Sequence, residues 1–455
     1  MSRATLLHAL NQYPEAHILS LLEEKNALAL AIGAALAHDD LVVGFTSLAQ
    51  VHITACNDVC LSLAMQYRLK NLRLFVSVAH DEERDVHDLA QQYRKIGWKA
   101  TVCVDGGDVS DVLVSEDSSI CFCLWDVDRS CVNERMHSYN NQCVSHMNDL
   151  LLKYKKDFFV NRPYESTSCT ANKMLGKMFN QTKNYFSISD GVPGLKLFNN
   201  IISFGEGVLS FYEMWVIYMH VVEGFSQLKP CVIESSADNL ALLANGIEML
   251  SAQHSPVVHC VICNDEMNRN TVELYSMLAD IERSGKAHVF RPADALETIE
   301  CLECALSLYN GHAILVLNSR PSVSVRFCGR KNLCAGGAYI LMDDHLYDES
   351  VTLVASGDVI SLALYTKNLL NKENVSVRIV SMPCERLAHQ NDVMFAEDSS
   401  LGAYKLHHCT ASGSEKTGVY GLIYHGVDMN DRYTSASCLV HNILQNMRSH
   451  GRSLH

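Results

Sequence analysis

Two Cys-x-x-Cys pairs are the arrangements in this sequence that most directly suggest chemistry, because zinc ligands often have this spacing. The pairs are Cys260/Cys263 and Cys301/Cys304. The first pair falls in a strand-like run, where residues three apart point to opposite faces. The second pair falls inside a predicted helix rather than a zinc knuckle. We therefore predict buried free thiols at all four positions and no metal site.

Two charged residues stand at positions where a ligand could be bound. Glu206 lies between Gly205 and Gly207 in a predicted turn, and a turn glutamate is usually exposed to solvent. Arg320 follows the apolar run 313–317 at a predicted strand end. One arginine is a weak phosphate site by itself, and an ion pair at a domain joint is the alternative reading. Neither residue alone defines a catalytic centre.

The stretch around Arg320 has the pattern of one α/β unit. A short apolar run ends at Phe290-Arg291-Pro292, and Asp294 stands in the first turn of a helix that continues to Leu308. A second apolar strand, 313–317, follows. The unit therefore places Arg320 at the carboxyl end of a strand.

The rest of the chain repeats this alternation of strands and helices, which predicts parallel sheets with both faces covered. Further strands are predicted at 40–47, 72–78, 101–104, 120–125, 185–187, 201–204, 257–263, 351–355 and 375–382. Further helices are predicted at 21–37, 53–67, 86–96, 238–252, 271–284 and 358–371.

The composition indicates a packed globular protein. Of 455 residues, 48% are hydrophobic and 19% are charged, and the formal net charge is −14. An acidic chain is a poor general binder of nucleic acid. No apolar stretch is long enough to span a bilayer, and the first 20 residues lack the apolar centre of a secretory signal. We therefore expect a cytoplasmic protein with no nucleic-acid or membrane partner, whose 18 cysteines are free thiols.

Several of these stretches resemble transketolases. Phe290-Arg291-Pro292-Ala293-Asp294-Ala295-Leu296-Glu297-Thr298, followed by Ser319-Arg320, resembles their pyrimidine-binding domain. Val351-Thr352-Leu353-Val354-Ala355-Ser356-Gly357-Asp358 and Val377-Arg378-Ile379-Val380-Ser381-Met382-Pro383 resemble their C-terminal domain. Shorter matches at 67–72, 96–98 and 104–106 resemble their diphosphate-binding domain.

The resemblance implies a three-domain α/β fold of the transketolase type, with parallel and mixed sheets and a truncated first domain. We place the diphosphate-binding-type domain at 1–118, a linker at 119–168, the pyrimidine-binding-type domain at 169–333 and the C-terminal domain at 334–455.

Transketolases use thiamine diphosphate and Mg²⁺, and the resemblance also shows which of their site residues this chain lacks. Ala49 and Ala79 stand where the family has its metal ligands, and Val208 stands where it has the carboxyl that activates the cofactor. Glu206 is two positions early and is the remaining candidate for that acid. The ring of the cofactor stacks on aromatic side chains in the family, but none occurs between Phe225 and Tyr275, and the matching stretch is 231–236.

Arg320 matches one of the family's two substrate-phosphate arginines, Ser168 stands at the position of the other, and Asp190 matches an acid near the cofactor. Other positions of the group are replaced, by Gly194, Cys260 and Val272, and Asn268 replaces the aspartate that binds the substrate hydroxyl.

These replacements predict a catalytically inactive transketolase-like protein, without cofactor or metal, that has a structural, regulatory or partner-binding role. The alternative is an active enzyme that transfers two-carbon ketol units between sugar phosphates, as in the pentose phosphate pathway, with thiamine diphosphate and Mg²⁺. The resemblance also implies a homodimer, or a heteromer with a complete transketolase.

Overall fold

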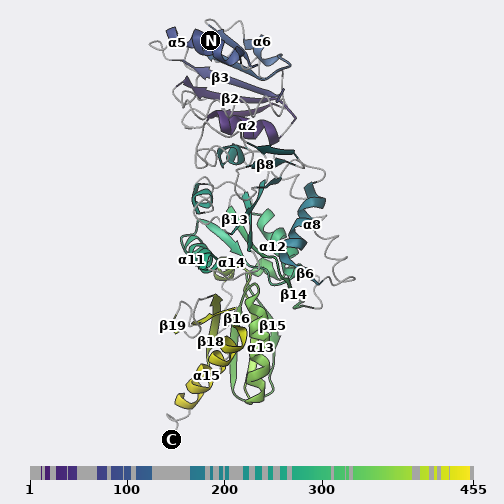
Figure 1. The fold of residues 1–455 in the computed structure, drawn as a ribbon, viewed down its shortest axis with the longest axis vertical. Coiled ribbons are helices and arrows are strands. Elements are labelled where there is room, and N and C mark those ends of the chain that lie inside the picture. The colour runs from purple at the N-terminus through teal and green to yellow at the C-terminus, as the bar shows by residue number, and fades with distance from the viewer. Residues whose placement is uncertain are drawn as a thin grey trace. The chain divides into compact units, whose positions relative to one another are not determined.

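The computed structural model contains three main sheets with helices packed on them (Figure 1). It describes residues 12, 16–20, 27–37, 39–48, 69–78, 83–95, 97–103, 109–124, 164–179, 185–187, 194–197, 200–203, 219–224, 231–237, 244–249, 257–263, 269–308, 312–322, 324–326, 331–391, 400–408, 415–417, 422–429 and 431–450. Contacts divide the chain into two compact units. The first comprises 1–145, 182–233 and 255–257, and the second comprises 146–181, 234–254 and 258–455.

The first sheet is parallel throughout and lies in the first unit. Its strands, in spatial order, are β1 (His17–Ser20), β2 (Val42–Ser47), β3 (Leu72–Ser77), β5 (Ser119–Cys123) and β4 (Lys99–Cys103). The accompanying helices are α2 (Ala27–Ala37), α5 (Glu83–Lys95) and α6 (Val109–Leu113). Every residue of α2 is buried, which explains why its sequence is apolar on all sides. A short antiparallel hairpin, β8 (Gly194–Leu197) with β9 (Asn200–Ser203), belongs to the same unit.

The second sheet contains the α/β unit predicted from the sequence. Its neighbouring strands include, in spatial order, β12 (Ala287–Phe290), β13 (His312–Asn318), β11 (Val257–Cys263) and β10 (Cys231–Ser236). The registers of β12 with β13 and of β11 with β13 are parallel. Its helices are α8 (Thr167–Phe179), α11 (Arg269–Arg283) and α12 (Ala295–Leu306). Helix α12 begins where the Asp294 side chain accepts a hydrogen bond from the Glu297 N–H, 2.8 Å away, which caps the helix.

The third sheet is mixed. Its strands, in spatial order, are β15 (Tyr339–Asp343), β17 (Ser376–Ser381), β16 (Ser350–Ala355), β18 (Ala403–His408), β20 (Leu422–Val427) and β19 (Glu415–Thr417). The four inner strands are parallel, and the two edge strands are antiparallel to their neighbours. The helices are α13 (Val359–Lys372), α14 (Glu385–Gln390) and α15 (Arg432–His450). The sheet, α13 and α15 share one apolar core, and the elements are labelled in Figure 1.

The α/β class with parallel and mixed sheets is therefore confirmed. The predicted domain boundaries stay predictions. Strand β5 belongs to the first sheet although it begins just after the predicted boundary at 118. Near the other end of the predicted linker, β6 (Glu165–Ser166) pairs with β14 (Pro321–Ser322). This stretch therefore belongs to the same compact unit as β14.

Candidate functional site

A pocket of about 250 Å³ lies in the second compact unit, where the carboxyl ends of β11 and β13 meet the start of α13. The last residues of the two strands, Cys263 and Asn318, are paired in register and both line the pocket. Ligands of open α/β sheets bind outside the carboxyl ends of the strands. The pocket therefore lies at the edge of the sheet where such proteins bind ligands.

Arg320 lines this pocket, and hydrogen bonds fix the backbone on both sides of it. Before Arg320, the Ser319 hydroxyl donates to the Cys263 carbonyl at 2.9 Å, and the Asn318 N–H donates to Thr167 Oγ1 at 2.7 Å. After Arg320, β14 pairs with β6. The chain thus presents the arginine from a rigid strand end rather than from a long loop.

The pocket carries more positive than negative side chains. Arg432, from the start of α15, joins Arg320, and Asp358, from the start of α13, is the lining carboxylate. Ser361 adds a hydroxyl from the first turn of α13. Apolar side chains form much of the remaining wall, namely Ala293, Val325, Ile360 and Leu364. Such a lining fits a small anion that also has an apolar part.

Tyr275 forms another wall of the pocket and is held against Arg291. The Arg291 guanidinium carbon lies 5.9 Å from the centre of the Tyr275 ring, which is cation–π distance. Burial raises the pKa of the Tyr275 phenol well above its usual value. The hydroxyl therefore stays protonated at neutral pH and can donate a hydrogen bond.

Most other predicted site residues cannot be placed. Glu206 and Asp190 lie outside the described residues, as do Val208, Ala49, Ala79 and Asn268. Ser168 is in α8, partly exposed, with its hydroxyl 3.1 Å from that of Ser166. Of the predicted candidates, Arg320 is therefore the one that the structure places in a pocket.

The prediction of buried free thiols is confirmed for three of the four residues of the two pairs, Cys260, Cys263 and Cys301, and Cys304 differs in being only partly buried. Among the residues that the structure describes, no group of three or more His, Cys, Asp or Glu side chains could hold a metal ion. Within the same residues, no helix is long and apolar enough to cross a membrane.

Strand β10 occupies the stretch where the family resemblance expects the aromatic platform. Cys231, Val232 and Ile233 are fully buried there. Burial raises the pKa of Glu234 above its usual value. Small apolar side chains thus fill this part of the core, and the strand itself carries no ring.

The architecture defines an α/β protein built from parallel and mixed sheets, with a pocket at strand ends. A family model described as the transketolase-like C-terminal domain matches residues 337–414. The transketolase of Cereibacter sphaeroides is 39% identical over 111 residues, which are 24% of this chain and 17% of that protein. The transketolase of Rhodobacter capsulatus is 31% identical over 164 residues, covering 36% of this chain and 21% of the relative. The matched part is thus about a fifth of each relative's length.

Solved structures show the same fold over more of the chain. Transketolase from Campylobacter jejuni superposes with a TM-score of 0.57 and 14% identity, covering 92% of this chain and 81% of that one. Transketolase from Leishmania mexicana gives a TM-score of 0.55 and 16% identity, covering 93% and 79%. The chain thus has a transketolase-type fold, and its residues 337–414 form a transketolase-like C-terminal domain.

Proposed function

We propose that this transketolase-like protein does not catalyse ketol transfer and has a structural, regulatory or partner-binding role. The observation that carries the proposal is β10, where Cys231, Val232 and Ile233 occupy the stretch expected to hold the cofactor's aromatic platform. Stacking on such a platform depends on planar π faces, which aliphatic side chains lack. The replacement of the metal ligands by Ala49 and Ala79 in the sequence supports the same proposal.

The first prediction is that thiamine diphosphate with Mg²⁺ does not bind. A diphosphate needs a hard cation held by oxygen ligands, and alanine offers none. Isothermal titration of the protein with cofactor and excess Mg²⁺ is expected to show no binding heat. An authentic transketolase titrated in the same buffer is the control.

A dissociation constant in the micromolar range or tighter would overturn the proposal and favour the active-enzyme alternative. In that case Glu206→Gln decides the mechanism, because glutamine keeps the shape of the side chain but cannot exchange the proton that activation requires. Ketol transfer by the wild type, abolished in Glu206→Gln, would establish Glu206 as the activating acid.

We also propose that the pocket beside Arg320 binds a small anion of the sugar-phosphate class. Two arginines, Arg320 and Arg432, and one acidic residue, Asp358, line the cavity. Guanidinium groups bind phosphate with paired, charge-assisted hydrogen bonds. A transketolase of the same fold, from Pichia stipitis, was solved in complex with xylulose-5-phosphate, and this ligand is a suitable probe.

The second prediction concerns this pocket. Arg320→Ala is expected to weaken binding of xylulose-5-phosphate about tenfold or more, because a charge-assisted hydrogen bond contributes roughly 1.5–3 kcal/mol. Arg283→Ala is the matched control, since Arg283 is an exposed arginine paired with Asp280 and does not line the pocket. Equal affinities of the wild type and Arg320→Ala would contradict the role of the arginine.

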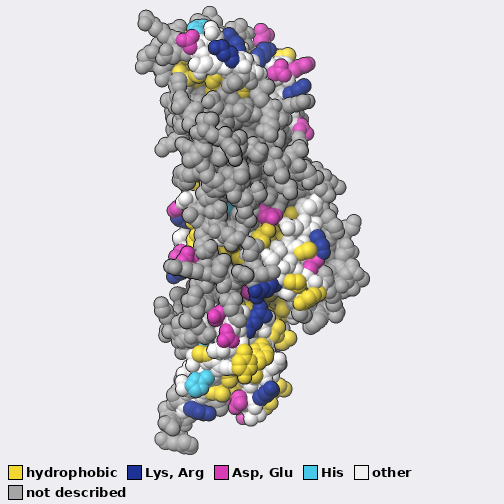
Figure 2. Space-filling model, viewed as in Figure 1, with side chains coloured by type: hydrophobic (Ala, Val, Ile, Leu, Met, Phe, Trp, Pro, Cys, Tyr) yellow, Lys and Arg dark blue, Asp and Glu magenta, His cyan; other side chains and the backbone are white. Residues whose placement is uncertain are grey.

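Homodimer formation, pairing with a complete transketolase and residence in the cytoplasm remain proposals. Figure 2 shows hydrophobic side chains on the visible face of the part that holds the third sheet. Exposed large hydrophobic residues of that part include Ile340, Leu346, Tyr347 and Tyr365. Exposed apolar side chains of this kind favour a protein partner, and sedimentation equilibrium at micromolar concentration can check for a dimer.

A further inference from the structure

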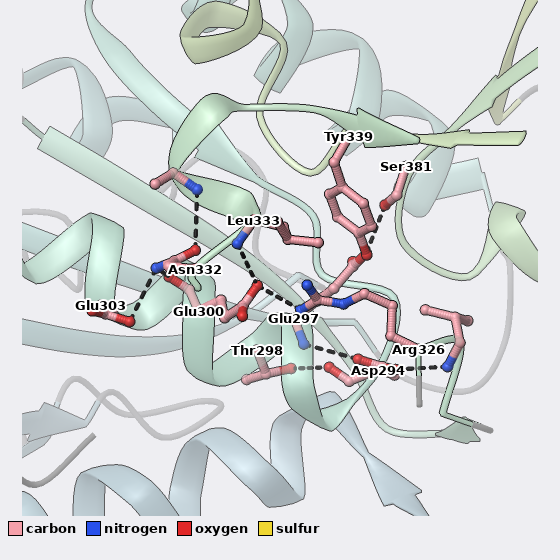
Figure 3. Close-up of polar contacts among 12 residues, drawn as sticks. Asp294, Glu297, Thr298, Glu300, Glu303, Arg326, Asn332, Leu333, Tyr339 and Ser381 are labelled. Atoms are coloured by element: carbon pink, nitrogen blue, oxygen red, sulfur yellow. Dashed lines mark hydrogen bonds and ion pairs between the residues drawn. The ribbon is translucent and has the colours of Figure 1, made fainter. Parts of the chain in front are cut away.

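Glu297, in the first turn of α12, is fully buried, and its carboxylate accepts three hydrogen bonds (Figure 3). The Tyr339 hydroxyl from β15 and the Ser381 hydroxyl from β17 both donate to Oε1 at 2.6 Å. The Ala293 N–H donates to Oε2 at 2.7 Å. One side chain of α12 is thereby bonded to two strands of the third sheet.

The surroundings of Glu297 are rich in carboxyl groups. Asp294 is buried beside it and accepts hydrogen bonds from the N–H groups of Glu297 and Val325, at 2.8 and 2.7 Å. Glu300, one turn further along α12, pairs with Arg326 at 2.5 Å. Among these described groups, three buried carboxyls therefore share one guanidinium. The donors that contact Glu297 itself are neutral.

Other groups in the cluster do not supply the missing positive charge. The Arg326 guanidinium lies 4.8 Å from the centre of the Tyr339 ring and is already paired with Glu300. Burial raises the pKa of Tyr339 above its usual value and that of the Cys301 and Cys334 thiols as well, so these groups are neutral at physiological pH. Among the groups that the structure describes around Glu297, a proton is therefore what can neutralise this carboxyl.

We propose that Glu297, Tyr339 and Ser381 form a proton-dependent latch that joins helix α12 to the third sheet. The proposal does not depend on the proposed function, because the latch lies in the scaffold and not in the pocket. Figure 3 shows the three side chains converging from the helix and from two strands.

The hydrogen bonds determine where the proton binds. Oε1 contacts two hydroxyls that can turn to accept a hydrogen bond, whereas among the described atoms Oε2 contacts the Ala293 N–H, which can only donate, so the proton finds an acceptor on the Oε1 side. Oε1 then becomes a donor, and either Tyr339 or Ser381 must turn its hydroxyl to accept. In the ionised state both hydroxyls donate charge-assisted hydrogen bonds to Oε1. Proton binding therefore changes the link between α12 and the strands.

The electrostatics agree with this geometry. Burial first, and then the charge of Asp294, raise the pKa of Glu297 from 4.5 to about 7, while the hydrogen bonds from Ser381, Tyr339 and the Ala293 N–H act in the opposite direction. Burial also raises the pKa of Asp294. The latch consequently changes state near neutral pH.

The third prediction follows from proton linkage. Between pH 4.5 and about 7 the folded protein binds the Glu297 proton and the unfolded chain does not, so this group's contribution to stability decreases as pH rises through that window. Glu297→Gln has no such proton. The difference in melting temperature, Glu297→Gln minus wild type, should therefore increase by about 5 °C from pH 5 to pH 8. Differential scanning calorimetry across the range measures this.

A second pair of variants separates the latch from a purely structural contact. Tyr339→Phe and Ser381→Ala each remove a donor to the ionised carboxylate, so the pH midpoint of the stability change should move upward in both. The matched control is Tyr365→Phe, at an exposed tyrosine of α13. A structural contact would lower stability equally at every pH. An unmoved midpoint in both variants, or parallel pH profiles of Glu297→Gln and wild type, would overturn the proposal.

Discussion

Replacing Gly337 with alanine is expected to destabilise the protein by more than about 3 kcal/mol, because two unfavourable effects coincide. Gly337 ends the short 3₁₀ turn Cys334–Gly336 with φ of 83°, a conformation that side chains disfavour. A Cβ atom there would lie 2.0 Å from the Ala388 nitrogen and 2.6 Å from the Cys384 carbonyl oxygen. Both are backbone atoms that cannot move aside by a rotamer change.

The neighbouring glycine is the matched control for this variant. A Cβ atom on Gly336 would meet nothing within 4 Å, and its φ is not positive. Gly336→Ala is therefore expected to leave stability within about 1 kcal/mol of wild type, or to raise it slightly by restricting the unfolded chain. Urea unfolding of both variants measures the difference. Equal stabilities of the two would show that the backbone at Gly337 is not held as the structure has it.

Replacing His312 with phenylalanine is expected to protect the protein against acid. His312 begins β13, is buried, and has no hydrogen-bond partner for either ring nitrogen among the described atoms. Its ring stacks on that of His259 with 6.0 Å between centres, and the Nε2 of His259 lies 2.8 Å from the Ser235 hydroxyl. Burial lowers the pKa of His312 from 6.5 to about 3, and burial together with the charge of His312 lowers the pKa of His259 from 6.5 to about 3.

Proton linkage at His312 determines in which direction the stability changes with pH. Between pH 6.5 and about 3 the unfolded chain binds a proton at His312 that the folded protein does not, so stability decreases as pH falls. At pH 5 the loss is about 2 kcal/mol for each histidine. The contribution of Glu297 to stability changes with pH in the opposite direction. It is the same in wild type and in His312→Phe, so it cancels when the two proteins are compared. His312→Phe should therefore gain about 2 kcal/mol relative to wild type between pH 7.5 and pH 5.

Chemical unfolding of wild type and His312→Phe at the two pH values measures this gain. His87→Phe is the control, since His87 is an exposed histidine of α5 and its replacement should leave the acid sensitivity unchanged. Any strain from the larger phenyl ring adds the same cost at both pH values. A gain below about 0.5 kcal/mol would mean that His312 is not buried in its neutral form.

The sequence alone was sufficient where the signal was local. The run 288–317 predicts β12, α12 and β13 in order, and the stretches 351–358 and 375–382 predict β16 and β17. Apolar periodicity and helix capping act over a few residues, so they can be read from the chain directly. The family resemblance through 351–383 depends on the same local patterns. The residues Glu206 and Asp190 stay predictions, because both lie outside the described residues.

Only the tertiary structure brought the functional side chains together. Glu297 was visible in the sequence as part of a helix start, but its partners Tyr339 and Ser381 are 42 and 84 residues further along the chain. Arg320 was predicted at a strand end, whereas Arg432 joins it from a helix that packs on another sheet. Strand order and the packing of the elements decide which distant side chains line one cavity or lie around one carboxyl. Local sequence patterns encode neither the strand order nor the packing. The burial of His312 beside His259 was decided in the same way, by the parallel register of β11 and β13.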